Sequence, residues 1–298
     1  AVWDSGELLS PRIRRRNFYT TLDILPIQYD PFTKYDNSEE EISRLLDRKI
    51  VEEKEKYNVV YVDEAQDFRK EWIDFIFNKV ILGEARERDF IVAADDAQRI
   101  YRRRDFTWNS LDFKFTGRSK ILRTIFRNSA RIWIFSAFLL EEKAAYVRDP
   151  DEKGELIFAN KGKYEPLVQK CKDIDEQLNF VVQTCQNMLK EGYAARNVLV
   201  LYRSKTVLYK RGQFHIPLKL QERLRRVGIA SDWIAEDAEA KRSFDWDADT
   251  VKISTVHSAK GMDSPIVFVL GVETYETKNE EELDEIKLLY VALTRARE

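Results

Sequence analysis

The stretch from Asn58 to Asp67 reads NVVYVDEAQD, an apolar run that ends in a cluster of acids. The continuous run at 59–62 is typical of a strand buried on both faces of a parallel sheet. Asp63 and Glu64 follow at its carboxyl end, where open α/β sheets bind ligands. The two acids could hold Mg²⁺ beside a phosphate and orient a water, or they could cap the following helix. The complete string DEAQD favours the functional interpretation.

Similar apolar runs recur along the chain and alternate with helical patterns. Further strands are predicted at 90–94, 121–123, 156–159, 198–202, 251–255 and 266–271. Helices are predicted at 38–56, 69–81, 129–143, 165–191, 219–227 and 284–298. This alternation predicts an α/β fold of parallel sheets flanked by helices.

Composition narrows the class of protein. The chain has 298 residues, of which 44% are hydrophobic and 34% charged, enough for about two domains with real cores. Its two cysteines, Cys171 and Cys185, exclude a disulfide framework, and their spacing does not suit zinc. We therefore expect a reducing, cytoplasmic compartment. No apolar run approaches the roughly 18 residues of a membrane span, so no membrane association is expected. The net charge of −2 does not suggest a compact basic DNA-binding domain, although local basic patches are compatible with it.

A second polar segment follows the predicted strand at 90–94. It reads DDAQRIY from Asp95 to Tyr101, and the amide of Gln98 could sense a terminal phosphate and an attacking water together. Three arginines at 102–104 then precede Phe106 and Trp108. Cations interleaved with aromatic rings suit single-stranded nucleic acid. A basic surface loop with both rings in the core is an equally good interpretation of this segment alone.

Together with later segments, these stretches resemble the superfamily 1 helicases of the UvrD/Rep type. The string at 63–67 is similar to their Walker B motif, and 95–101 resembles the motif that couples ATP to the DNA strand. The other matching segments, in the family's order, are LRTIFRNS (122–129), VLVLYRSK (198–205), VKISTVHSAKGMD (251–263) and LLYVALTRARE (288–298).

The resemblance implies a fold, an activity and a set of site residues. It implies a partial first RecA-like domain at 1–118 and a second RecA-like domain at 119–298, in an ATP-dependent DNA helicase or translocase that uses Mg²⁺. The implied catalytic residues are Asp63, Glu64, Gln98, Arg127 and Arg295, with Asp63 and Glu64 also holding the metal. The implied nucleotide-binding residues are Phe126, Gly261 and Asp263, with Phe126 stacking on adenine. The implied contacts to single-stranded DNA, or RNA, are Tyr101, Arg103, Trp108, Thr255 and His257. Without the resemblance, Arg127 could be an ordinary ion-pair partner and Arg295 a cation at a helix end.

The sequence also departs from the family pattern. A P-loop needs Gly-Lys followed by Ser or Thr, but the single Gly-Lys pair, Gly162-Lys163, is followed by Tyr164. We therefore expect a carboxyl-terminal portion of a helicase whose P-loop lies upstream, and which alone hydrolyses little ATP. Arg103 stands where the family often stacks a Trp, and Asp263 where Glu is common. The alternative is a catalytically inactive helicase-like module that binds nucleic acid or a partner.

Overall fold

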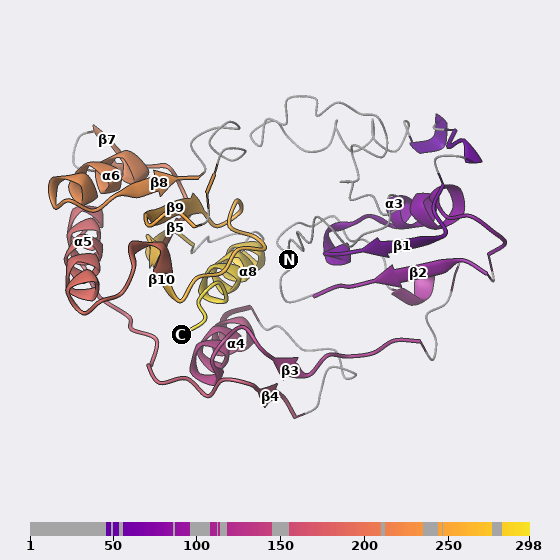
Figure 1. The fold of residues 1–298 in the computed structure, drawn as a ribbon, viewed down its shortest axis with the longest axis horizontal. Coiled ribbons are helices and arrows are strands. Elements are labelled where there is room, and N and C mark those ends of the chain that lie inside the picture. Colours follow the sequence, from indigo (N-terminus) through magenta and orange to yellow (C-terminus); the bar gives the residue numbers. More distant parts are fainter. Residues whose placement is uncertain are drawn as a thin grey trace. The chain divides into compact units, whose positions relative to one another are not determined.

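The chain divides into two compact units, of which the first ends at Ser119 and the second begins at Lys120. The structure, a computed structural model, describes residues 46–48, 50–53, 56–85, 87–95, 108–111, 113, 118–144, 155–209, 212–234, 244–245, 247–275 and 282–298 (Figure 1).

The first unit contains a parallel β-helix-β arrangement. Strand β1 (Val59–Val62) pairs in parallel with β2 (Asp89–Val92), which confirms the pairing predicted from their apolar runs. Between them lie a 3-10 turn, η2 (Ala65–Asp67), and helix α3 (Lys70–Phe75). A π-helical segment, η3 (Ile76–Val80), continues α3. The core of this unit gathers the buried side chains of β1, α3 and η3, including Val62, Trp72, Ile73, Phe75 and Ile76.

The expectation that these two strands are buried on both faces is wrong. Val62 is buried and Val60 packs against the core, whereas Val59, Tyr61 and Ile91 are exposed. Successive side chains of a strand point to opposite faces. In the described part of the first unit, helix α3 and its extension cover one face of the pair, and the other face remains accessible.

The second unit is built on a four-stranded parallel sheet with the strand order β10-β5-β9-β8. Its strands are β5 (Val198–Tyr202), β8 (Ser231–Trp233), β9 (Val251–Thr255) and β10 (Ile266–Leu270). Figure 1 shows this sheet between helices α5 (Ile174–Lys190) and α6 (Ile216–Arg226) on one side and α8 (Glu282–Leu293) on the other. Every residue of β5 is buried, as the prediction for a central parallel strand requires.

Smaller elements surround this sheet. Strands β3 (Thr124–Ile125) and β4 (Ile157–Phe158) pair in parallel beside helix α4 (Ala130–Ala144). Strands β6 (Thr206–Tyr209) and β7 (Gly212–His215) form an antiparallel hairpin that the sequence analysis missed, as it missed β8. The short 3-10 segments are η5 (Trp108–Ser110), η7 (Ala195–Asn197) and η8 (Val272–Tyr275). None of the helices in the described ranges is long and apolar enough to cross a membrane.

Several predicted boundaries are wrong for identifiable reasons. The strand predicted at 121–123 begins later, because Leu122 is exposed and pairing starts where the Arg123 carbonyl accepts from Ile157 N at 3.0 Å. The helix predicted from residue 165 begins at Ile174, where the Asp173 side chain caps it by accepting from Glu176 N at 2.9 Å.

Two other helices are shorter than predicted. The last helix ends at Leu293 instead of residue 298, since the following residues bond to other segments. Of the helix predicted at 38–56, residues 46–48 are helical and 50–52 are not, while residues 38–45 lie outside the described residues.

A buried lysine interrupts the apolar pattern of β9. The Nζ of Lys252 donates to Thr250 Oγ1 at 2.6 Å, to the Asp245 and Ala248 carbonyls at 3.0 Å each, and to Asp232 Oδ2 at 3.1 Å. A buried charge is tolerated only when it is paired and hydrogen-bonded, and here four oxygens surround it. The lysine therefore anchors the segment that leads into β9.

The packing of α6 on the sheet allows a direct test of the core. Leu220 is 0% exposed in the cluster that joins α5, α6 and the sheet, whereas Leu218 on the same helix is 49% exposed. We expect Leu220→Ala to lower the free energy of unfolding by about 2–5 kcal/mol, because it leaves a cavity. Leu218→Ala is the matched control and should change it by about 0.5 kcal/mol or less. Urea unfolding of both variants measures this, and equal losses would contradict the described packing.

Candidate functional site

The acids predicted as catalytic follow β1 directly. Asp63 is exposed, and its Oδ1 accepts from the backbone N of Glu64 at 2.9 Å. Glu64 has a φ of 55°, in the left-handed region that residues with a side chain rarely adopt. Backbone strain of this kind concentrates at functional sites, where the surrounding structure holds it in place. The strained turn projects two carboxylates from the carboxyl end of a parallel strand.

A buried amide connects this turn to the neighbouring strand. Gln66 is fully buried; its Nε2 donates to Glu64 Oε2 and its Oε1 accepts from Asp95 N at 2.9 Å. Gln66 therefore orients the predicted catalytic carboxylate and ties it to the chain just beyond β2. The sequence analysis did not select this residue. The signal was the Gln in DEAQD, since an amide can donate and accept at the same time.

Three predicted residues of the first unit, Gln98, Tyr101 and Arg103, lie outside the described residues. Trp108 is partly buried and packs against the core of the first unit. This placement fits the alternative in which Trp108 is a core residue.

In the second unit, three segments far apart in the sequence meet at what we call the three-segment junction, residues 127–129, 262–265 and 294–298. The buried Asn128 side chain donates from Nδ2 to the carbonyls of Thr294, at 2.9 Å, and Ala296, at 2.5 Å. Ser129 N donates to the Arg297 carbonyl at 3.1 Å, and Arg297 N donates to the Ser264 carbonyl at 2.9 Å. These bonds hold the chain beyond α8 against both other segments.

The exposed rim of the junction carries predicted nucleotide-binding residues. Phe126, one residue before the junction, is 77% exposed, so its ring is accessible to a ligand. Asp263 Oδ2 lies 3.7 Å from Arg127 Nε and 3.0 Å from Arg297 Nε. Gly261 has a φ of +84°, which favours glycine at this turn. Thus the structure brings Arg127 and Asp263 together, and adds Arg297, which the sequence analysis did not select.

Arg295 is placed differently from its neighbour Arg297. Its side chain is buried, with Nε donating to the Val291 carbonyl at 2.9 Å and Nη1 to the Met262 carbonyl at 3.2 Å. In this structure the guanidinium therefore links the end of α8 to the loop before Asp263, inside the second unit.

The residues predicted to contact nucleic acid in the second unit follow β9. Thr255 Oγ1 accepts from Ser258 N at 3.1 Å and so stabilises the turn after the strand. His257 is exposed on that turn. Desolvation by the surrounding protein and then the Arg203 cation lower the pKa of His257, and Glu285 opposes them. The lowered pKa favours the neutral form of the ring.

A charged pair beside His257 joins the sheet to α8. Arg203 donates to Glu285 through Nε, at 2.7 Å, and through Nη2, at 2.6 Å. Two-pronged pairing of this kind is stronger and more directional than a single ion pair. It connects the carboxyl end of β5 with the first turns of α8, the helix that leads to Thr294 and Arg295. The sequence analysis placed Arg203 in a family segment without giving it a role.

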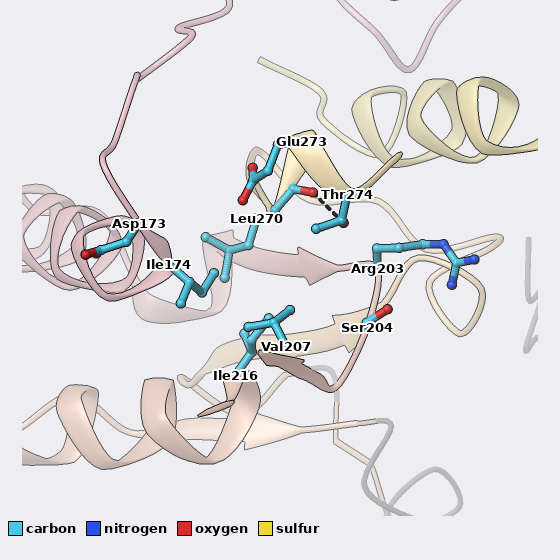
Figure 2. Close-up of a pocket in the computed structure, with 10 residues that line it drawn as sticks. Asp173, Ile174, Arg203, Ser204, Val207, Ile216, Leu270, Glu273 and Thr274 are labelled. Carbon is cyan, nitrogen blue, oxygen red and sulfur yellow. Dashed lines mark hydrogen bonds between the residues drawn. The ribbon is translucent and has the colours of Figure 1, made fainter. Parts of the chain in front are cut away.

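A cavity of about 240 Å³ lies near the same edge of the sheet (Figure 2). Ile174, Val207, Ile216 and Leu270 make it apolar, and Asp173 and Glu273 also line it. Figure 2 shows the guanidinium of Arg203 pointing away from these apolar side chains. The negative charge that Asp173 and Glu273 bring to this cavity suits a phosphate poorly, so the junction is the better nucleotide candidate.

A metal site made by protein ligands alone is absent from the described residues, where no three His, Cys, Asp or Glu side chains are grouped to hold an ion. Mg²⁺ is commonly bound through one or two carboxylates together with substrate phosphates. The adjacent Asp63 and Glu64 carboxylates fit that mode.

Comparisons with known proteins find a family match in the last part of the second unit. Residues 221–298, which include two of the three junction segments, match the family model of the UvrD-like helicase C-terminal domain. These residues are therefore similar to the C-terminal domain of UvrD-like helicases. The match confirms the resemblance to UvrD-like superfamily 1 helicases that the ordered motifs indicated, and the parallel α/β architecture agrees with it.

Curated relatives agree with this helicase domain. A probable DNA helicase II homolog of Mycoplasma genitalium is 29% identical over 133 residues, covering 41% of this chain and 17% of that protein. A probable DNA helicase II homolog of Mycoplasma pneumoniae is 41% identical over 68 residues, covering 20% of this chain and 9% of that protein. The RecBCD enzyme subunit RecB of Chlamydia pneumoniae is 40% identical over 62 residues, covering 21% of this chain and 6% of that protein. The chain therefore spans less than a fifth of each of these relatives.

The three-segment junction can be tested through its buried carboxamide, that of Asn128. Asn128→Ala removes two hydrogen bonds to carbonyls, so we expect the free energy of unfolding to fall by about 1–3 kcal/mol. Amide hydrogen exchange should also rise at 294–298. The matched control is Asn160→Ala, since Asn160 is exposed and its Oδ1 accepts only from Gly162 N, at 2.9 Å, among its described side-chain bonds. Equal stability losses, or unchanged exchange at 294–298 in Asn128→Ala, would contradict this role.

Proposed function

We propose that this chain supplies part of the ATP site and part of the nucleic-acid surface of a superfamily 1 DNA helicase, which couples ATP hydrolysis to movement along single-stranded DNA. The observation that carries the proposal is the three-segment junction. It brings together an exposed arginine and an acid from two segments that resemble nucleotide-binding motifs of this family, and an exposed aromatic ring, Phe126, lies one residue before it. In the same proposal, 1–118 belongs to a first RecA-like domain and 119–298 to a second.

The chemistry of phosphoryl transfer supports these roles. Catalysis of this reaction is mostly positioning and charge stabilisation, and an arginine beside the transferred phosphate can be worth about 10³–10⁵ in rate. We assign Arg127 to the phosphate and Phe126 to the adenine ring. Arg295 remains a proposed phosphate sensor that would have to exchange its carbonyl partners for the phosphate.

On the first unit, Asp63 and Glu64 are the proposed ligands of Mg²⁺, which would neutralise phosphate charge. Glu64, oriented by Gln66, is also the proposed base that positions the attacking water, together with Gln98. The P-loop lysine of such a site is not supplied by these 298 residues, in which Tyr164 follows the single Gly-Lys pair. We therefore expect the chain alone to hydrolyse ATP slowly, with a P-loop supplied from upstream.

The lack of a P-loop lysine in these 298 residues favours a second candidate function. This is a helicase-like module that binds nucleic acid or a partner without hydrolysing ATP. Both candidates use a nucleic-acid surface made of Thr255 and His257 on the second unit and Tyr101, Arg103 and Trp108 on the first. The names of the helicase II homologs point to DNA, and RNA would suit the same residues. We place the protein in the cytoplasm, which suits its unpaired cysteines.

Adenine stacking on Phe126 separates the two candidates. A fluorescent ATP analogue should bind the wild-type chain, and Phe126→Ala should weaken binding about 2–10-fold, the range of an aromatic stacking contact. Phe138→Ala is the matched control, because Phe138 is an exposed ring on α4 outside the junction. Binding that is absent, or equally weakened in both variants, would favour the module without an ATP site.

Salt dependence tests the nucleic-acid surface. A labelled single-stranded oligonucleotide should bind with little dependence on sequence, and Arg103→Ala and His257→Ala should weaken it. If Arg103 contacts one phosphate, its loss should also reduce the slope of log affinity against log salt by roughly 0.7. Fluorescence anisotropy at several salt concentrations measures both quantities.

The control for this experiment is Arg226→Ala. Arg226 ends α6, just before the start of β8, and therefore lies at the amino edge of the sheet, opposite the carboxyl edge that carries Thr255 and His257. Arg226→Ala removes one positive charge, as Arg103→Ala does, but should leave the affinity for the oligonucleotide unchanged. If the Arg103 and His257 variants bind as tightly as this control, these residues do not form the surface.

A further inference from the structure

Two arginines share one carboxylate oxygen at the three-segment junction. Asp263 Oδ2 lies 3.0 Å from Arg297 Nε and 3.7 Å from Arg127 Nε. The side chains are partly open to solvent, with exposed fractions of 49% for Arg297, 39% for Arg127 and 34% for Asp263. Two cations facing one anion leave a net positive charge at the rim, and each arginine is engaged there through Nε.

The backbone places both arginines independently of the acid. Arg297 donates its N–H to the Ser264 carbonyl and accepts at its own carbonyl from Ser129 N. Its α-carbon is therefore fixed between the residue that follows Asp263 and the residue two after Arg127. These backbone bonds do not involve the carboxylate, so they would still hold the Arg297 backbone beside both other segments if it were removed.

Arg297 is partly exposed, whereas the guanidinium of Arg295 is buried and bonded to the carbonyls of Val291 and Met262. Of the three arginines in the junction, Arg127 and Arg297 are the two that present their side chains to solvent. A phosphate group could reach them without disturbing the end of α8.

We propose that Arg297 is a second anion-binding arginine beside Arg127, and that Asp263 is a positioning residue that occupies both until a phosphate group displaces it. The ligand class is the polyphosphate of a nucleoside triphosphate, and this assignment rests on the proposed function.

The chemistry of the three groups supports this exchange. A polyphosphate carries more charge than a carboxylate and can accept paired hydrogen bonds from a guanidinium fork. When the site is empty, the carboxylate offsets the repulsion between two neighbouring cations. When the site is filled, Asp263 can return to water, because a third of it is already exposed. Asp263 therefore competes with the phosphate rather than assisting its binding.

The competition predicts a gain of binding on removal of an acid. Inorganic tripolyphosphate, which has neither base nor ribose, is titrated into the 298-residue chain at low salt and followed by calorimetry. Asp263→Asn should tighten binding by about 2–5-fold, on the scale of partly exposed ion pairs. Arg297→Gln and Arg127→Gln should each weaken binding by a similar factor.

Helix α6 offers matched controls. Glu222 also serves two cations there, with Lys219 Nζ 3.1 Å away and Arg226 as the second partner. Glu222→Gln removes the same charge as Asp263→Asn, and Arg226→Gln the same charge as the arginine variants. Both should leave tripolyphosphate affinity unchanged. Circular dichroism and thermal melting check folding, and Asp263→Ser replaces Asp263→Asn if the latter does not fold.

Several results would overturn the proposal. They are weaker binding by Asp263→Asn, an Arg297→Gln variant that binds like wild type, an equal gain in Glu222→Gln, and no binding of tripolyphosphate by the wild-type chain. The proposed function fails separately. If the variants change tripolyphosphate affinity as expected but binding of the ATP analogue does not depend on Phe126, the anion site stands and the proposed helicase nucleotide site fails. If binding of the analogue depends on Phe126 but the Asp263 and Arg297 variants bind tripolyphosphate like wild type, the helicase nucleotide site stands and the role proposed for Arg297 and Asp263 fails.

Discussion

The buried carboxamide of Asn128 is the interaction on which the second unit's candidate site depends. It bridges the carbonyls of Thr294 and Ala296, which follow the end of α8 and would otherwise lack a helical partner. Backbone bonds from Ser129 and Ser264 complete the connection. Because the helix end is satisfied by other segments, the chain leaves α8 in one direction and carries Arg297 to Asp263.

In the first unit, too, one buried amide side chain forms hydrogen bonds to two groups. Gln66 holds the Glu64 carboxylate and the backbone of Asp95 at once. A buried amide without partners costs free energy, so the contacts of Gln66 and the strained backbone of Glu64 stabilise each other's geometry. Both sites therefore rest on buried Asn or Gln side chains, while Asp63, Arg127, Asp263 and Arg297 stay at least partly exposed. Charges kept at the rim avoid the cost of full desolvation and remain available to a ligand.

The sequence was most informative where burial is complete. The bounds predicted for β5 and β9 agree with the structure because both are central strands, and the apolar run of β5 reflects contact on both faces. Prediction failed for short elements at the periphery, such as β3 and the β6–β7 hairpin, whose residues face partly to solvent. It also extended α5 upstream of Asp173, since Leu167 and Val168 suit a helical pattern yet are exposed in the structure.

The sequence by itself determined the α/β class, the order of the motifs and the residue types that could bind a nucleotide. These features depend only on the local periodicity and spacing of residues. Phe126, Arg127 and Asp263 were recognised through their motifs. Only the tertiary structure decided which of the two arginines in residues 294–297 is exposed to solvent. Arg295 and Arg297 are two residues apart and chemically identical, so no local pattern separates them. The end of α8 and the bonds from Asn128 and Ser264 turn one inward and the other outward.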